Sequence, residues 1–116
     1  MGSVLLLLLA AVAAGAPGAA LPTAAPVAVK AGDLFFEPKT LTVPAGEVVF
    51  EVRNEGAIEH NFVVEDQQRR ALAQIPVIAP GASETVRGTL TPGAYRIVCS
   101  YPGHAEAGMT GTLAVK

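Results

Sequence analysis

Short runs of β-branched and aromatic residues, separated by turn-forming residues, limit the folds open to this 116-residue chain more than any other feature. Such runs predict strands at residues 27–30, 34–37, 40–43, 48–54, 61–65, 84–89, 94–99 and 111–115. Between them lie turn signals at Pro44-Ala45-Gly46, Asn54-Glu55-Gly56, Pro80-Gly81 and Pro92-Gly93. Pro followed by Gly fits the two central positions of a type II turn. Strands at intervals of about 8–12 residues predict an all-β sandwich or barrel.

Two of the predicted strands alternate as expected when one face of a sheet is buried. Phe50 and Val52 share one face of residues 48–54, and charged residues occupy the other. In residues 94–99, Cys99 falls on the apolar face. The pattern therefore predicts that Cys99 ends a strand on its inward side.

One segment is a candidate helix. Residues 67–74 are mostly polar and long enough for about two helical turns. Because the segment has no wide apolar face, we interpret it as a connection across the sandwich and not as a core element.

The start of the chain differs in composition from the rest. Residues 4–14 are all apolar, small residues follow, and the first charged side chain is Lys30. This is the layout of a secretory signal peptide. We predict a signal peptide or an uncleaved membrane anchor at residues 1–20, a short linker at 21–26 and a folded domain at 27–116. Both readings place the domain in the periplasm or elsewhere outside the cytoplasm, and a buried helix of a cytosolic domain is the remaining alternative.

Charge and cysteine content exclude several classes of protein. The formal net charge is −2 and no basic run is present, so the sequence predicts no nucleic-acid binding. One cysteine cannot form an intrachain disulfide or a site that needs two thiolates. Two histidines are too few for a histidine-rich multinuclear metal site.

The residues that could bind a soft metal ion concentrate near the end of the chain. Cys99, His104 and Met109 follow one another with four residues in each gap. The remaining histidine, His60, lies at the start of a predicted strand. All cysteines, histidines and methionines of the predicted domain can therefore belong to one site.

Together these donors suit copper. Thiolate and thioether are soft donors that favour Cu(I), whereas imidazole suits both oxidation states. Two imidazoles and a thiolate in a plane, with a distant thioether, favour neither state strongly, so little needs to move when an electron arrives. Pro102, Gly103 and Gly108 allow a tight loop around an ion. Taken alone, each of these four residues could have an ordinary structural role without a metal. Explaining all four in that way would require several coincidences.

With these residues in view, the sequence resembles the cupredoxins, small blue copper proteins of the plastocyanin, azurin and auracyanin kind. The resemblance covers nearly all of residues 34–116. It rests on Phe36-Glu37-Pro38, Leu41-Thr42-Val43-Pro44-Ala45-Gly46, Asn54-Glu55-Gly56, Glu59-His60-Asn61-Phe62 and, above all, the block from Cys99 to Val115. The four-residue gap between Cys99 and His104 is closer to azurin and auracyanin than to plastocyanin.

The resemblance implies a Greek-key sandwich of about eight strands with one type 1 copper ion at one end. His60 and His104 match the two imidazole ligands, Cys99 the thiolate and Met109 the axial thioether. Asn61 matches a residue whose side chain ties the two ligand-bearing segments together.

The expected function is the transfer of single electrons between partners outside the cytoplasm, with copper cycling between Cu(I) and Cu(II). We expect His104 to be the electron portal, within a small, nearly uncharged docking patch of Pro102, Gly103, Ala105, Ala107 and Gly108. Candidate partners are c-type cytochromes, a terminal oxidase, a photosynthetic reaction centre and a reductase. Contact with a membrane is expected only through an uncleaved N-terminal anchor.

Two other functions stay open at this point. The same ligands could serve a copper delivery or storage module without electron transfer. A metal-free β-sandwich could serve as an adhesion or interaction module. No enzyme activity is expected, because assigning these residues to copper leaves no catalytic dyad and a closed four-ligand site has no open position.

Overall fold

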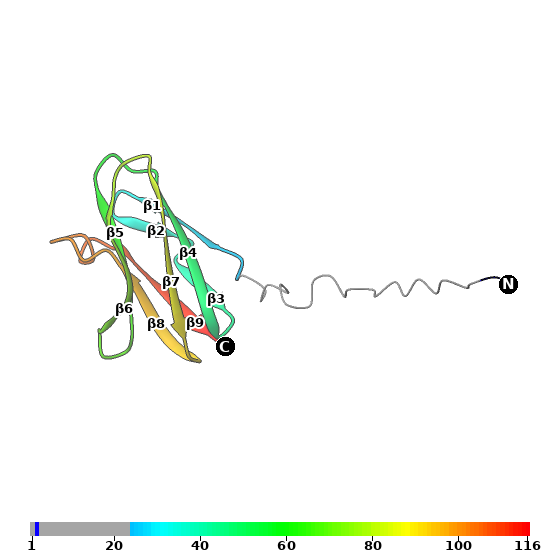
Figure 1. Cartoon of the computed structure of the whole chain (residues 1–116). Helices are drawn as coiled ribbons and strands as arrows, with labels where there is room; N and C mark the ends of the chain where they lie inside the picture. Colours follow the sequence, from blue (N-terminus) through cyan, green and yellow to red (C-terminus); the bar gives the residue numbers. More distant parts are fainter. Residues whose placement is uncertain (1, 3–23) are drawn as a thin grey trace.

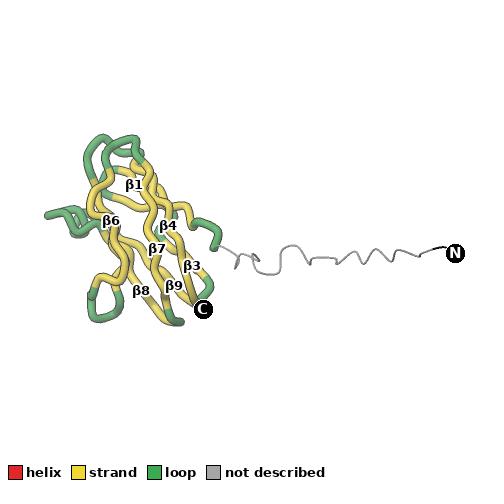
Figure 2. Tube along the Cα trace, viewed as in Figure 1, coloured by secondary structure: helices red, strands yellow, loops and turns green. Residues whose placement is uncertain are grey.

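The computed structural model describes residue 2 and residues 24–116, and this part of the chain forms nine β-strands and no helix (Figure 1). The strands are β1 (Val27–Gly32), β2 (Phe35–Glu37), β3 (Thr40–Val43), β4 (Gly46–Asn54), β5 (His60–Glu65), β6 (Ala71–Ile78), β7 (Ser83–Leu90), β8 (Gly93–Val98) and β9 (Thr110–Val115). They are joined by turns and loops alone (Figure 2). The predicted all-β sandwich is confirmed.

The strands form two sheets. One has the order β2-β1-β4-β7 and the other the order β3-β9-β8-β5-β6. The pairs β1/β4 and β3/β9 are parallel, and all other paired neighbours are antiparallel. Parallel neighbours cannot be joined by a hairpin, so the chain crosses repeatedly from one sheet to the other. These crossings give the sandwich its connectivity.

A cluster of phenylalanines from both sheets fills the centre of the sandwich. Phe36 and Phe50 come from one sheet and Phe62 from the other, and all three are fully buried. The ring of Phe62 lies 5.6 Å from that of Phe36 and 5.3 Å from that of Phe50, in edge-on and tilted arrangements. Such aromatic pairs add specific contacts to the burial of apolar area. Phe50 is inward-facing, as the alternation in β4 predicted.

The helical interpretation of residues 67–74 was wrong. The Asp66 carboxylate accepts the backbone N–H groups of Gln68 and Arg70 in a turn, and β6 follows. Among the described strands β6 lies at the edge of its sheet, paired with β5 on one side, so many of its side chains face solvent. Ile75 and Ile78 still point into the core. The segment is polar because it lies at this exposed edge. Local sequence alone does not distinguish an exposed edge strand from a polar helix.

The pairing of β5, β8 and β9 brings distant parts of the chain to one end of the sandwich. Val98, the last residue of β8, pairs with Val63 of β5 and with Thr110, the first residue of β9. The start of β5 and the whole loop between β8 and β9 therefore lie at the same end. That loop projects from the sandwich and is drawn in orange in Figure 1.

The predicted leader at residues 1–20 lies outside the described residues apart from Gly2, and it stays a prediction. Among the residues that the structure describes, no helix is long and apolar enough to cross a membrane.

Candidate metal centre

The loop between β8 and β9 begins with a tight turn that its sequence dictates. His104 donates its backbone N–H to the carbonyl of Tyr101 at 3.0 Å, closing a four-residue turn. Pro102 occupies the first central position, where its fixed φ is favourable. Gly103 follows with a φ of 82°, the left-handed value that a type II turn requires at its second central position. This turn fixes the backbone from which the His104 side chain departs.

Backbone hydrogen bonds then join the three donor residues of the loop. Cys99 donates its N–H to the carbonyl of Met109 at 3.1 Å, and Met109 donates its N–H to the carbonyl of His104 at 3.0 Å. These bonds run between residues five and ten positions apart in the chain. The relative backbone positions of Cys99, His104 and Met109 are therefore set by the fold of the loop itself.

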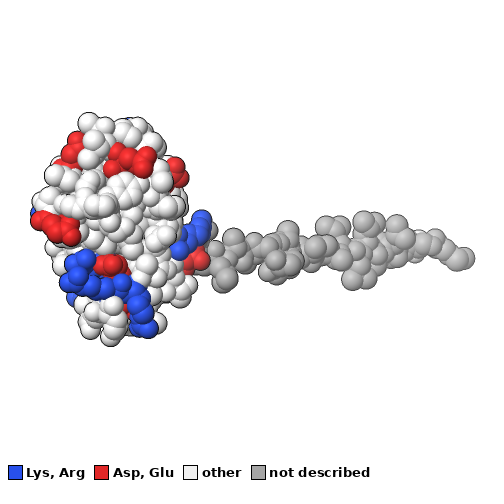
Figure 3. Space-filling model, turned by 90° about the vertical axis from the view of Figure 1, so that its left-hand side faces the viewer, with Lys and Arg blue, Asp and Glu red and all other residues white. Residues whose placement is uncertain are grey.

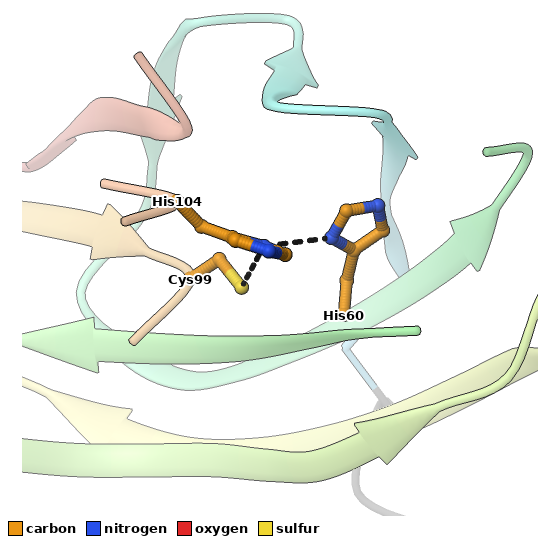
Figure 4. Close-up of side chains that lie close together, drawn as sticks. All are labelled: His60, Cys99 and His104. Carbon is orange, nitrogen blue, oxygen red and sulfur yellow. Dashed lines mark hydrogen bonds between the residues drawn. The ribbon is translucent and has the colours of Figure 1, made fainter. Parts of the chain in front are cut away.

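Three of the four predicted donors lie side by side. The Nδ1 atom of His104 is 3.3 Å from Nδ1 of His60 and 3.4 Å from Sγ of Cys99 (Figure 4). One donor atom from each of the three residues lies within 4.8 Å of the others. His60 comes from the start of β5 and the other two from the loop, so both segments face a common point.

The donors differ in their access to solvent. The side chains of His60, Cys99 and Met109 are fully buried. His104 is only half-buried, and most of its loop neighbours are exposed. Solvent and other proteins can therefore approach the centre most directly at His104.

The spacing of the donors fits one copper ion. Zinc–imidazole and zinc–thiolate bonds are about 2.0–2.3 Å long, so three such ligands in a plane around one ion lie roughly 3.5 Å apart. The observed separations of 3.3 and 3.4 Å are close to this value. A buried thiol beside two imidazoles is a donor set that copper accepts in both oxidation states.

Asn61 connects β5 to the loop in three ways. Its backbone N–H points at Sγ of Cys99 at 3.5 Å. Its side-chain Nδ2 donates to Oγ of Ser100 at 2.7 Å, and its Oδ1 accepts the backbone N–H of Ser100 at 2.8 Å. The two segments that carry the donors are thus held together by side-chain and backbone contacts.

Tyr101 anchors the loop to β6. Its hydroxyl donates to Oε1 of Glu59 at 2.8 Å and lies 3.0 Å from the carbonyl of Pro76. Its ring packs edge-on against the ring of His104, with 5.7 Å between centroids. Burial and the hydrogen bond to Glu59 raise the pKa of Tyr101 to about 12. The phenol is therefore neutral at ordinary pH and keeps its role as a donor.

Sequence reasoning missed Asp33, in the turn between β1 and β2. Its Oδ1 lies 3.1 Å from Nε2 of His60, the ring nitrogen that faces away from Cys99 and His104. The backbone N–H of Ala57, followed by His60, lowers the pKa of Asp33 below its ordinary value. No local pattern could have identified this contact, because it joins positions 27 residues apart.

A buried thiol, two facing imidazoles and a buried methionine at one end of a two-sheet β-sandwich define a small mononuclear copper protein. A family model described as the cupredoxin-like domain matches residues 3–115, and the chain belongs to this family. Its cofactor is one copper ion, as the sequence predicted.

Relatives and solved structures agree with this assignment. The chain is 34% identical over 120 residues to the copper-resistant cuproprotein CopI of Rubrivivax gelatinosus, a match that covers 88% of this chain and 73% of the relative. It is 36% identical over 90 residues to plastocyanin A/B of Petroselinum crispum, a match that covers 72% of this chain and 90% of the relative. The structure of auracyanin B superimposes with a TM-score of 0.73 at 28% identity, and the match covers 84% of this chain and 93% of auracyanin B.

Proposed function

We propose that His60, Cys99, His104 and Met109 hold the copper ion. The observation that carries this assignment is the close approach of three side chains. Nδ1 of His104 lies 3.3 Å from Nδ1 of His60 and 3.4 Å from Sγ of Cys99, although His60 and Cys99 are 39 residues apart in the sequence. The assignment of Met109 rests on its complete burial and on the backbone bonds that join it to Cys99 and His104. Thiolate and thioether add the soft donors that copper prefers.

The function that this centre supports best is the shuttling of single electrons between redox partners outside the cytoplasm. When bound, copper supplies the chemistry by alternating between Cu(I) and Cu(II). The chain contributes a donor set held by its own hydrogen bonds, so that the protein has little to rearrange in either state. Asn61 directs a backbone N–H at the Cys99 sulfur, and such a contact stabilises negative charge on a thiolate. No catalytic reaction is part of this proposal.

His104 is the proposed electron portal because it is the donor residue with solvent access. The proposed docking patch around it consists of Pro102, Gly103, Ala105, Ala107 and Gly108, all exposed or half-buried. Figure 3 shows the side of the molecule toward which the loop projects, where charged groups border a broad uncharged area. A patch of small residues with few charges suits brief encounters with small contact areas.

The proposed partners follow from the predicted location. They are c-type cytochromes, a terminal oxidase, a photosynthetic reaction centre or a reductase, each of which exchanges single electrons. The predicted leader at residues 1–20 would bring the domain to their compartment or tether it there. Fractionation of cells that produce the full chain would test this location, and recovery of the protein from the cytoplasm alone would refute it.

Copper delivery or storage is a second candidate function. It is favoured by the similarity to CopI, whose name describes a copper-resistant cuproprotein. It requires that copper leave the site readily. The burial of His60, Cys99 and Met109 speaks against easy release, because His104 is the one of the four residues that a competing ligand can approach directly from solvent. Release of Cu(I) to a chelator at a rate comparable to electron exchange would favour delivery over electron transfer.

The ligand assignment is tested by titrating the copper-free protein with Cu(II) and recording its visible spectrum. We expect an intense thiolate-to-copper charge-transfer band at one equivalent. Cys99→Ser should abolish this band, whereas the control Ser100→Ala, which keeps the thiol, should retain it. A band of full intensity in Cys99→Ser, or no band in the unchanged protein, would refute the assignment.

The portal is tested by electron self-exchange between the Cu(I) and Cu(II) forms of one variant. Ala105→Glu places a negative charge beside His104, and two such surfaces repel each other, so self-exchange should slow by at least tenfold at low ionic strength. Ala94→Glu adds the same charge at the start of β8, at the other end of the sandwich, and serves as the control. Equal rates in the two variants would exclude docking at His104.

A further inference from the structure

The carboxylate of Asp33 contacts the imidazole of His60, and the proposed electron transfer assigns no role to this contact. The turn between β1 and β2 places Oδ1 of Asp33 3.1 Å from Nε2 of His60. The His60 side chain is fully buried, whereas 44% of the Asp33 side chain is exposed. The carboxylate thus closes the outer side of a buried imidazole whose inner nitrogen faces the metal centre.

The neighbouring loop is built to hold this carboxylate. Both Oδ atoms of Asp33 accept the backbone N–H of Ala57 at 3.0 Å, and the N–H of Ile58 lies 3.4 Å from Oδ1. Gly56 leaves the space that the carboxylate occupies, since a Cβ on this residue would lie 2.1 Å from Oδ1. Two amides and one glycine therefore fix the position of Asp33 independently of His60.

The contact determines which nitrogen of His60 carries the proton. A neutral imidazole has one N–H group, and a carboxylate can only accept a hydrogen bond. With Asp33 at Nε2, the proton of the neutral ring stays on Nε2, and the lone pair of Nδ1 faces Cys99 and His104. Carboxylates placed behind metal-binding histidines act in this way, and they also strengthen the imidazole as a donor.

We propose that Asp33 is a positioning residue that orients His60 for copper and lowers the reduction potential of the centre. This inference rests on the proposed ligand set. Orientation follows from the hydrogen bond, and the lower potential follows from charge. A negative carboxylate near the ion favours Cu(II), which carries the higher positive charge, over Cu(I). Partial exposure of Asp33 reduces the effect through screening but does not remove it.

The proposal is tested first without copper. In the copper-free protein, in mildly alkaline solution, nitrogen NMR should show the proton of His60 on Nε2. In Asp33→Ala, which removes the acceptor, the ring should populate both tautomers. A His60 proton on Nδ1 in the unchanged protein would overturn the proposal, and this readout requires neither copper nor a variant that folds.

The second test is the reduction potential of the copper-loaded protein. Asp33→Asn keeps the size of the side chain and removes its charge, so the equilibrium with a fixed redox partner should shift about tenfold toward Cu(I), or about 59 mV for one electron. Gly56→Ala should raise the potential too, because its methyl group displaces the carboxylate. Asp66→Asn is the control, since Asp66 also accepts two backbone N–H groups but lies in the turn before β6.

The outcomes separate this inference from the proposed function. A shift below twofold in Asp33→Asn, in a protein that still shows the thiolate-to-copper band, would refute the role of Asp33 and leave the ligand set intact. An equal shift in Asp66→Asn would also refute it, because any distant acidic residue would then have the same effect. Loss of the band in the unchanged protein would refute the ligand set itself.

Discussion

Replacing Asn54 should destabilise the protein far more than replacing an exposed polar residue. Asn54 is the last residue of β4 and is completely buried. Its Nδ2 donates to the carbonyls of Ile58 at 2.8 Å and Ile78 at 2.9 Å. Its Oδ1 accepts the backbone N–H of Gly56 at 2.9 Å. One side chain therefore secures the loop between β4 and β5 and joins it to the end of β6.

The expected cost follows from these three bonds. A hydrogen bond in a folded protein contributes about 1 kcal/mol net, so Asn54→Ala should lower the free energy of unfolding by about 3 kcal/mol. For a domain of this size, 1 kcal/mol corresponds to about 4–8 °C in the melting temperature, so the midpoint should fall by about 12–24 °C. Asn54→Asp should cost at least as much, because a carboxylate would face two carbonyl oxygens without a proton to donate.

Urea unfolding of the copper-free protein, followed by circular dichroism, measures this cost without a contribution from metal binding. Thr112→Ala is the control, because Thr112 makes a single exposed side-chain contact, 3.4 Å from Thr40, and its loss should change the free energy of unfolding by less than about 0.5 kcal/mol. A loss below about 1 kcal/mol in Asn54→Ala, with an unchanged urea slope, would refute the argument that all three bonds stabilise the fold.

Three further predictions concern other parts of the molecule. Phe62→Ala should cost about 3–5 kcal/mol in urea unfolding because it leaves a cavity among three packed rings, and a cost near 1 kcal/mol would contradict the packing described. Gly103→Ala should cost only about 1–2 kcal/mol, since a Cβ there meets no atom within 4 Å and only its positive φ is unfavourable; a larger loss would indicate a steric clash. Folding raises the pKa of Tyr101 to about 12, first through burial and then through the hydrogen bond to Glu59, so the stability that the neutral phenol contributes is complete below about pH 10 and declines up to about pH 12. The difference in unfolding free energy between the unchanged protein and Tyr101→Phe should shrink over that range, and a constant difference would exclude a shifted phenol.

The strands were predictable where their environment matches their local pattern. β4 has one inward and one outward face, and its alternation is visible in the sequence. β6 was missed because it lies at an edge, where Leu72 and Val77 are exposed and only Ile75 and Ile78 are buried. Its spacing of apolar residues is not that of a simple half-buried strand, and pairing with β5 decides its structure.

The residues proposed as donors in the loop could be picked out of the sequence because one short segment carries them. Cys99, His104 and Met109 lie within eleven consecutive residues, so their spacing in sequence limits their spacing in space. His60 could be added because it is the other histidine of the chain. Asp33 could not, because aspartate in a turn has many roles and only the packing of β1 beside β4 brings it to His60.

The way in which the two halves of the centre are fixed bears on its function. The loop donors are held by backbone bonds among Cys99, His104 and Met109, and His60 is held by β5 and by Asp33. Asn61 then joins the halves. All of these bonds lie within the chain, so their energetic cost belongs to folding and not to copper binding. A carrier of electrons benefits from donors that stay in place in both oxidation states, whereas a delivery protein needs donors that open. The bonded framework therefore supports the proposal of electron transfer, and the side of the centre that is accessible to solvent is the side of His104.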